Sequence, residues 1–232
     1  MEHDPQLTAP AANPPRVAVC FHGFLRTGAS MWWVRRALLA DTWTRVELPT
    51  FVYQAAPLAH HAARAAALIR RLSEQSGGAP VDLVTHSMGG LLARAVLAEG
   101  AVPIHRIVML APPNQGAWMA DRVRRILPVH QLGWDPLAPL LPGAPRVLPG
   151  GEAAEIGIIT GGRGDPRGLV PFLPGDNDGR VRVDEARLDG AREFRVVPCG
   201  HATIMMRPAV LAMVRRFLLE GSFGPDGEDF QR

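Results

Sequence analysis

Residues 81–90 read Val81-Asp82-Leu83-Val84-Thr85-His86-Ser87-Met88-Gly89-Gly90, and in them an apolar run stops at a serine. The residues before Ser87 are typical of a buried strand, and those from Met88 to about Glu99 are typical of a helix. A serine at such a junction, with a glycine two places after it, is the pattern of a nucleophile elbow. The helix would direct its positive N-terminus toward this serine, so the pattern favours a chemical role for Ser87 over simple packing.

Two other strand ends carry the groups that an acyl-transfer site needs beside a serine. The apolar run Arg16–Phe21 predicts a strand that ends at His22-Gly23-Phe24, where Gly23 permits a turn. The backbone N–H of Phe24 would be one oxyanion donor, and the N–H of Met88 would be the other. A strand near 194–198 leads to Cys199-Gly200-His201, which places a histidine on a loop where it can act as general base.

The acid of a triad would lie between the serine and this histidine, and three aspartates are available. Asp178 is preferred over Asp165 and Asp176 because it stands directly before Gly179, where a firm turn would hold its carboxylate. Asp176 stays open as the alternative. The run that contains both aspartates also fits an ordinary Asx-rich turn, and it lacks the spacing of a calcium loop.

The order serine, acid, histidine is that of the α/β-hydrolase triad. From about Arg16 to Leu219 the chain resembles bacterial lipases and esterases of the α/β-hydrolase superfamily, close to the minimal lipases that have little lid. The likeness rests on His22-Gly23, on the residues around Ser87, and on the stretch that runs from Asp178 to His201.

This resemblance implies a role for each candidate residue of the site. It implies Ser87 as nucleophile, Asp178 as acid, His201 as base, and the Phe24 and Met88 amides as the oxyanion hole. The chain departs from these lipases at Thr85, which stands where the elbow motif has its first glycine, and in a longer region between residues 112 and 149. If the elbow helix sits slightly away from its strand, replacing Thr85 with glycine should preserve activity.

Alternating strand and helix patterns predict an α/β fold, the α/β-hydrolase fold, with a mostly parallel, doubly wound sheet and the site at its carboxyl edge. Strands are expected at about 16–21, 44–48, 81–86, 104–110, 156–160 and 194–198, and helices at about 30–40, 58–75, 88–99, 116–126 and 204–220. One domain would span 16–220, between a disordered leader at 1–15 and a frayed tail at 221–232.

Between residues 112 and 151 the alternation breaks, and apolar side chains stand among prolines. We expect a cap-like insertion here that supplies the apolar wall of an acyl-binding groove. A rigid surface loop that only seals the core is the alternative. Trp33, Trp118 and Trp134 are the candidate substrate-binding residues, and one of Trp32 and Trp33 is expected to pack inward.

The composition fits one sizeable core and excludes several functions. The 25 basic residues among 232 are all arginine, which excludes a catalytic lysine, and they are too scattered for a nucleic-acid surface. No cofactor or metal site is expected. No apolar run is long enough to span a membrane, and the first residues lack the features of a signal peptide, so we expect a cytoplasmic protein.

The other histidines and the two cysteines are expected to have structural roles. His22 would brace the oxyanion loop by hydrogen bonds, and the His86 ring would point away from the nucleophile and pack on a neighbouring strand. Cys20 and Cys199 would lie on strands too far apart for a disulfide, so both are expected to be free thiols.

Together these residues predict a serine hydrolase that cleaves a small-molecule or lipid carboxylic ester through an acyl-enzyme intermediate. An acyltransferase or thioesterase with the same triad stays open. So does a catalytically silent binding protein on the same scaffold.

Overall fold

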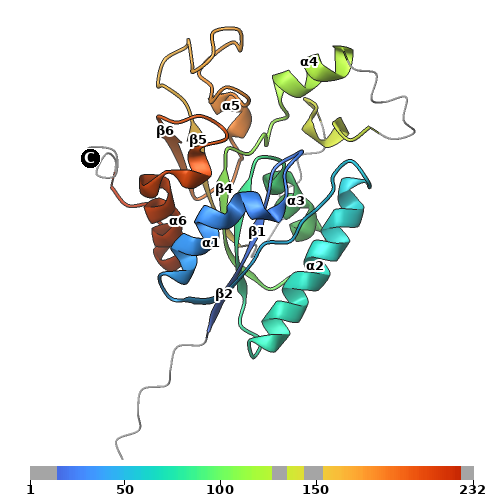
Figure 1. Ribbon diagram of the computed structural model, residues 1–232, viewed down its shortest axis with the longest axis vertical. Coiled ribbons are helices and arrows are strands. Elements are labelled where there is room, and N and C mark those ends of the chain that lie inside the picture. Colours follow the sequence, from blue (N-terminus) through green and yellow to red (C-terminus); the bar gives the residue numbers. More distant parts are fainter. Residues whose placement is uncertain (1–14, 127–134, 144–153, 226–232) are drawn as a thin grey trace, which may run out of the picture.

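The computed structural model describes residues 15–126, 135–143 and 154–225. A sheet of six parallel strands forms the centre, and helices cover both of its faces (Figure 1). The strands are β1 Arg16–Phe21, β2 Trp43–Glu47, β3 Val81–His86, β4 Ile104–Leu110, β5 Glu155–Gly161 and β6 Glu193–Val197. The α-helices are α1 Trp32–Leu39, α2 Leu58–Gln75, α3 Met88–Ala98, α4 Trp118–Ile126, α5 Val183–Ala186 and α6 Pro208–Glu220. Three 3-10 turns accompany them, η1 Gly28–Met31, η3 Ala138–Leu140 and η4 Ile204–Met206.

The strand order β2-β1-β3-β4-β5-β6 brings the ends of distant segments to one edge. Phe21 at the end of β1 pairs with Thr85 near the end of β3, and Gly161 at the end of β5 pairs with Val197 of β6. Because all strands are parallel, the loops that follow them emerge at the same edge. The elements α4, η3 and α5 lie beyond that edge (Figure 1).

Alternate residues of the central strands feed two separate cores. In β1, Val17, Val19 and Phe21 belong to the core under α2 and α3, whereas Ala18 and Cys20 belong to the core under α1 and α6. Figure 1 shows these two helix pairs on opposite faces of the sheet. A strand that is buried on both faces needs apolar residues at consecutive positions, which is why the β1 and β3 sequences read as continuous apolar runs.

Helix α2 follows its sequence pattern closely. Its buried side chains recur at intervals of three and four residues, and several are alanines that allow close packing on the sheet and α3. These residues are Ala62, Ala65, Ala66, Ile69 and Leu72. The bounds of 58–75 expected from the sequence are confirmed, because the amphipathic stripe alone defines this helix.

The sequence predicts a frayed tail from residue 221 onward, and this prediction is wrong for the first residues of that segment. Phe223 is only 1% exposed, and its ring centroid lies 4.8 Å from that of Phe217. The Phe223 N–H also donates to the Glu193 carboxylate at 2.7 Å. Gly157 of β5 makes room for the two rings, since a Cβ at this position would lie 2.6 Å from the Phe223 ring. A single aromatic residue after a helix gives little periodic signal, so this packing was missed.

The mostly parallel sheet expected from the sequence is confirmed, and each strand begins and ends within one residue of its expected bounds. The last helix begins at Pro208 rather than 204, because a 3-10 turn precedes it. Cys20 and Cys199 are both free and buried. Residues 1–14 of the expected leader and 226–232 of the tail lie outside the described residues, as do 127–134 and 144–153 of the insertion.

No helix in the described ranges has the length and apolar character needed to cross a membrane.

Replacing Phe223 with alanine should lower the free energy of unfolding by about 3 to 5 kcal/mol, the usual cost of emptying a buried aromatic site. The same change at Phe172, which is 66% exposed, should cost less than about 0.5 kcal/mol. Urea denaturation of both variants provides the comparison. Equal losses would mean that the residues after α6 do not pack as described.

Candidate active site

Ser87 occupies a strained turn between β3 and α3. Its φ is 53° and its ψ is −123°, a left-handed conformation that residues other than glycine rarely adopt. Hydrogen bonds hold both sides of the turn. The Ser87 N–H donates to the Leu110 carbonyl at 2.9 Å, and the Ser87 carbonyl accepts the Gly90 N–H at 2.9 Å. The serine side chain therefore projects from a fixed point at the carboxyl edge of the sheet.

Three glycines allow the chain to pack this closely around Ser87. A Cβ on Gly89 would lie 2.5 Å from the Phe21 carbonyl oxygen, and a Cβ on Gly23 would lie 3.1 Å from the Ser87 Cβ. The contact at Gly89 is closer than a side chain tolerates, and the one at Gly23 would require its neighbour to shift. Gly90 also allows close packing next to this turn, since a Cβ at this position would lie 2.8 Å from the Pro112 Cβ and 3.6 Å from the Thr85 Oγ1. The close approach at Gly90 is thus to Pro112, and Thr85, which replaces the first glycine of the motif, lies at ordinary contact distance.

His201 and Asp178 form a buried pair beside this turn. The His201 Nδ1 lies 2.7 Å from one Asp178 carboxylate oxygen, and the His201 N–H donates to the Asp178 carbonyl at 2.9 Å. The other carboxylate oxygen accepts the N–H groups of Arg180 and Val181 at 2.9 and 2.8 Å. With Nδ1–H donating to the carboxylate, Nε2 of His201 remains as an acceptor.

The structure joins His201 to Asp178 and not to the other two aspartates. The Asp176 carboxylate accepts the N–H groups of Arg163 and Gly164 at 2.7 and 2.9 Å, and so holds the loop after β5. Asp165 bonds the nearby Arg167 N–H at 2.8 Å in an exposed turn.

Sequence reasoning missed Asn177, which fixes the position of its neighbour Asp178. Asn177 is fully buried, and its side-chain amide donates to the carbonyls of Leu173 and Gly175 at 3.0 and 2.8 Å. Its side-chain oxygen accepts the Gly179 N–H at 3.0 Å. An asparagine in an Asx-rich turn was the available signal, but only the folded loop shows that its bonds tie together a whole segment.

His22 braces the Gly23–Phe24 peptide, as expected. Its Nε2 accepts the Phe51 N–H at 2.9 Å, so its Nδ1–H is the group that donates to the Gly23 carbonyl at 2.8 Å. Because the C=O and N–H of a trans peptide point in opposite directions, this bond also fixes the direction of the Phe24 N–H. Burial lowers the pKa of His22, which keeps the ring in this neutral, two-bonded form.

The backbone N–H of Phe24 donates no hydrogen bond within the described part of the chain. Met88 is the first residue of α3, and the first N–H groups of a helix lack intrahelical partners. Phe24 lines the same cavity as Ser87, the residue that directly precedes α3.

His86 does not point away from the serine as the sequence analysis expected. Its ring lies 4.8 Å from the His201 ring, and its Nε2–H donates to the His201 carbonyl at 2.9 Å. The left-handed turn at Ser87 redirects the chain just after His86, so strand alternation does not predict where this ring lies. Burial, followed by the charge of His201, holds the pKa of His86 well below its usual range.

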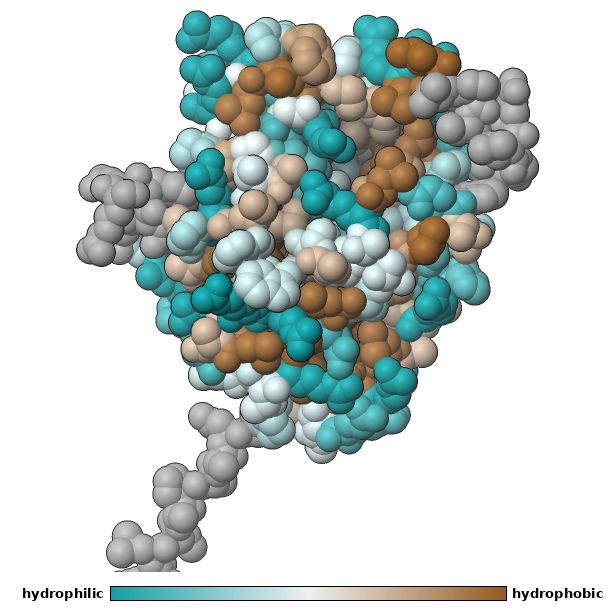
Figure 2. Space-filling model, viewed as in Figure 1, coloured by the Kyte–Doolittle hydropathy of each residue, from teal (hydrophilic) through white to brown (hydrophobic). Residues whose placement is uncertain are grey.

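These groups border one cavity of about 210 Å³, whose floor is formed by Ser87, His86, His201 and Phe24. Its wall on the side of α4 and η3 is apolar. That wall consists of Pro113, Ala117, Met119, Ala120, Val123, Leu137 and Leu140. Figure 2 shows hydrophobic patches at the upper left and the upper right of the molecule, at the end where α5 and α4 lie in Figure 1.

Glu185, which sequence reasoning did not single out, ties the apolar wall to the loop that carries Asp178. Its carboxylate accepts the Trp118 N–H at the start of α4 at 2.7 Å and the Arg182 N–H at 2.9 Å. Burial raises the pKa of Glu185. Nearby, burial raises the pKa of the Cys199 thiol to about 11, so this cysteine is not an alternative nucleophile.

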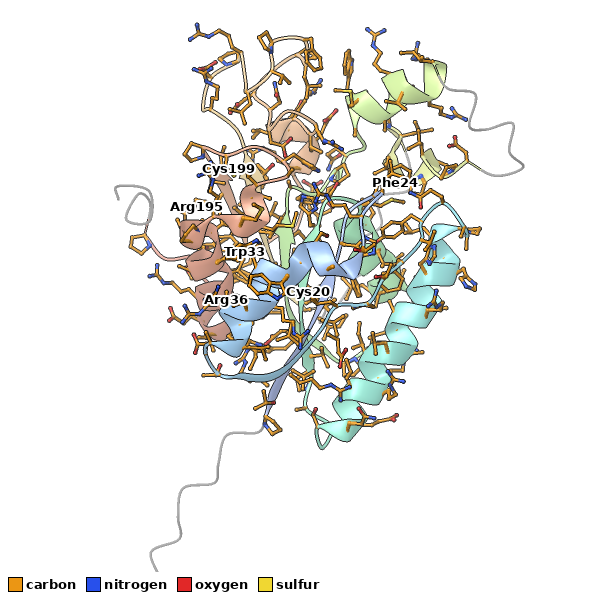
Figure 3. All side chains as sticks on the ribbon, viewed as in Figure 1. Cys20, Phe24, Trp33, Arg36, Arg195 and Cys199 are labelled. Atoms are coloured by element: carbon orange, nitrogen blue, oxygen red, sulfur yellow. The ribbon has the colours of Figure 1, made fainter. Side chains whose placement is uncertain are left out.

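Trp33 and Trp118, two of the three candidate substrate-binding tryptophans, do not line the cavity. Trp33 is 42% exposed on α1, edge-on to the 47% exposed Trp32, and lies well away from Phe24 (Figure 3). Neither member of that pair packs inward, because both lie on the solvent side of the helix. Trp118 faces a different depression, with Arg122 over its ring. Trp134 lies outside the described residues.

A family model described as "Domain of unknown function (DUF7379)" matches residues 2–130, which is more than half of the 232 residues. The chain belongs to this family. No curated protein matches the chain.

Solved structures show which fold this member of the family has. A lipase from Bacillus licheniformis, BlEst2 in its mature form, is similar with a TM-score of 0.64 and 19% identity, covering 87% of this chain and 90% of that one. Phospholipase PlaB from Legionella pneumophila is similar with a TM-score of 0.63 and 16% identity, and the match covers 87% of this chain and 59% of that one. A protein from Silicibacter sp. TM1040, provisionally described as a thioesterase, is similar with a TM-score of 0.58 and 16% identity. The match covers 87% of this chain and 74% of that one. The α/β-hydrolase fold expected from the sequence is confirmed.

The buried, neutral His86 should make the protein less stable in mild acid. Its lowered native pKa means that, below the ordinary value of about 6.5, the unfolded chain binds a proton that the native state does not. Stability should therefore fall as the pH drops from 6.5 to 5, with His86 contributing up to about 1.4 kcal/mol per pH unit.

Urea denaturation across this pH range measures the slope. The His86→Gln variant should show a flatter profile, since glutamine can donate to the His201 carbonyl without titrating. His60→Gln, at an exposed histidine of α2, controls for the loss of a histidine. A slope that is as steep in His86→Gln as in the parent would show that His86 does not cause it.

Proposed function

We propose that this protein is a serine hydrolase that cleaves carboxylic esters through an acyl-enzyme intermediate. Ser87 is the nucleophile, His201 the general base and acid, and Asp178 the residue that orients His201. The observation that carries this proposal is the hydrogen-bonded Asp178–His201 pair, whose histidine lines the same cavity as a serine on a strained turn.

In the first half of the reaction, the Ser87 Oγ attacks the ester carbonyl while His201 Nε2 takes its proton. The carbonyl oxygen becomes negative and receives hydrogen bonds from the N–H groups of Phe24 and Met88. His201 then gives its proton to the leaving alcohol oxygen as the ester C–O bond breaks. Water repeats these steps on the acyl-enzyme and releases the acid, which restores the serine.

The energetic balance favours a chemical reason for the strained turn. A left-handed residue other than glycine costs about 1 to 3 kcal/mol. One oxyanion donor is typically worth about 2.7 to 4 kcal/mol in the transition state. A turn that aims both the serine and the Met88 N–H can therefore return more in rate than it costs in stability.

The apolar wall would take the acyl group. In this proposal α4 and η3 are the described part of a cap on a domain that spans about 16–220. A cavity of about 210 Å³ is smaller than the roughly 300 to 1,000 Å³ of sites that enclose a drug-sized ligand. It would therefore hold part of the substrate, and short acyl chains suit it best.

Ser87→Ala should abolish hydrolysis of 4-nitrophenyl butanoate, with a loss of at least about 10³-fold in kcat, because no other group can form the acyl-enzyme. Ser76→Ala, at the exposed end of α2, is the matched control and should keep the parental rate. Release of 4-nitrophenolate measures the rate, and circular dichroism checks the fold. Parental turnover by a folded Ser87→Ala protein would remove Ser87 from the mechanism.

Asp178→Asn and Asp176→Asn make the same chemical change two residues apart. Asp178→Asn should lower kcat by about 10⁴-fold, because an amide would stabilise the wrong His201 tautomer. Asp176→Asn should keep kcat within about tenfold and instead lower the melting temperature, because it weakens bonds that hold the loop after β5. The reverse ranking of the two kcat values would make Asp176 the acid.

A further inference from the structure

Two arginines border the cavity, and the proposed chemistry uses neither of them. Arg26 lies just after Phe24, and its N–H donates to the Gly23 carbonyl at 3.3 Å. Arg180 follows Asp178, and its N–H donates to the Asp178 carboxylate at 2.9 Å. Both residues are exposed at the rim. The two cations thus reach one site from two loops that are far apart in the sequence.

Within the described residues, neither guanidinium forms an ion pair. Neighbouring arginines behave differently, since Arg163 and Arg167 pair with Asp165, and Arg182 pairs with Asp184. Arg26 and Arg180 line the same cavity, and the charge of each also lowers the pKa of the buried His86 ring. An apolar cavity with two unpaired cations at its rim suits a substrate that joins an apolar part to an anionic group.

Arg180 lies beside the residue that would protonate the leaving group of an ester. The apolar wall of α4 and η3 takes the acyl group, so the remaining part of the substrate must extend along the other side. His201 protonates the leaving oxygen and must therefore adjoin it. Arg180 is on that side, because its backbone binds the same carboxylate that holds His201.

Resting on the proposed function, we infer that the natural substrate is an ester whose leaving group carries a phosphate, held between Arg26 and Arg180. Guanidinium groups pair with phosphate oxygens through two parallel hydrogen bonds, and two guanidiniums match a group that has several oxygens and up to two negative charges. The phosphate takes no part in bond breaking. The ester C–O bond is cleaved, His201 supplies the proton to the released alcohol oxygen, and the phosphate leaves on that alcohol.

The test compares two soluble substrates that differ only in the phosphate, 1,2-dibutanoylglycerol 3-phosphate and 1,2-dibutanoylglycerol. Butanoate release by the full chain gives kcat/KM for each. We expect the phosphate ester to be preferred by about tenfold or more, the size of one charge-assisted hydrogen bond. In the double variant Arg26→Gln/Arg180→Gln this ratio should fall to about 1, whereas Arg71→Gln, an exposed arginine of α2, should keep the parental ratio.

The outcomes separate this inference from the function on which it rests. Ser87-dependent hydrolysis of both substrates, with a ratio near 1 or one that the double variant retains, would exclude a site for a soluble phosphate ester and leave the esterase proposal standing. Release of no butanoate from either substrate by a protein that hydrolyses 4-nitrophenyl butanoate would overturn the phosphate site alone, and loss of all three activities would overturn both. Unchanged denaturation midpoints confirm that the double variant is folded.

A further arm identifies the source of the phosphate. Vesicles of phosphatidylcholine with dioleoyl phosphatidic acid present it as a lipid headgroup, and the dibutanoyl compound presents it in solution. An arginine-dependent preference in the vesicles alone assigns the site to a lipid headgroup, and one in solution alone assigns it to a soluble phosphate ester. A preference in both supports the shared phosphate chemistry. Its absence in both contradicts the inference.

Discussion

The left-handed turn at Ser87 is the constraint around which this fold is arranged. A residue with a side chain stays in this conformation only where its surroundings leave it no alternative. Here β3 is paired on both sides, the Ser87 N–H is bonded to the end of β4, and Gly89 lets α3 rest directly on the end of β1. Because these contacts come from the centre of the sheet, opening the turn would disturb the most deeply packed part of the molecule.

Hydrogen bonds also hold the other groups of the site in place. Asn177 holds the turn of Asp178, Asp178 holds the Nδ1 side of His201, and His86 bonds the His201 carbonyl. On the other side, His22 fixes the peptide that carries the Phe24 N–H. Such groups are already in place before a substrate arrives, which is the condition under which fixed dipoles stabilise a transition state best.

The sequence predicted those parts of the molecule that local pattern governs. The strand at 81–86 and the helix at 58–75 follow from uninterrupted apolar runs and stripes, and Asp178 could be favoured because Gly179 marks a turn. It did not predict the orientation of the His86 ring, since that depends on the left-handed residue after it. Nor did it predict that Phe223 packs on Phe217, or that Trp33 and Trp118 face away from the cavity. For Phe223, the partners Gly157 and Glu193 come from distant strands, which a local pattern does not reveal.

The central claim is that Ser87 is an activated nucleophile, and covalent labelling tests it most directly. The full chain would be treated with a fluorophosphonate, digested, and examined by mass spectrometry for the site of the adduct. We expect one adduct on Ser87, formed far more slowly in His201→Gln because the general base is absent. A folded protein whose Ser87 stays unmodified, or whose labelling is the same without His201, would contradict the claim.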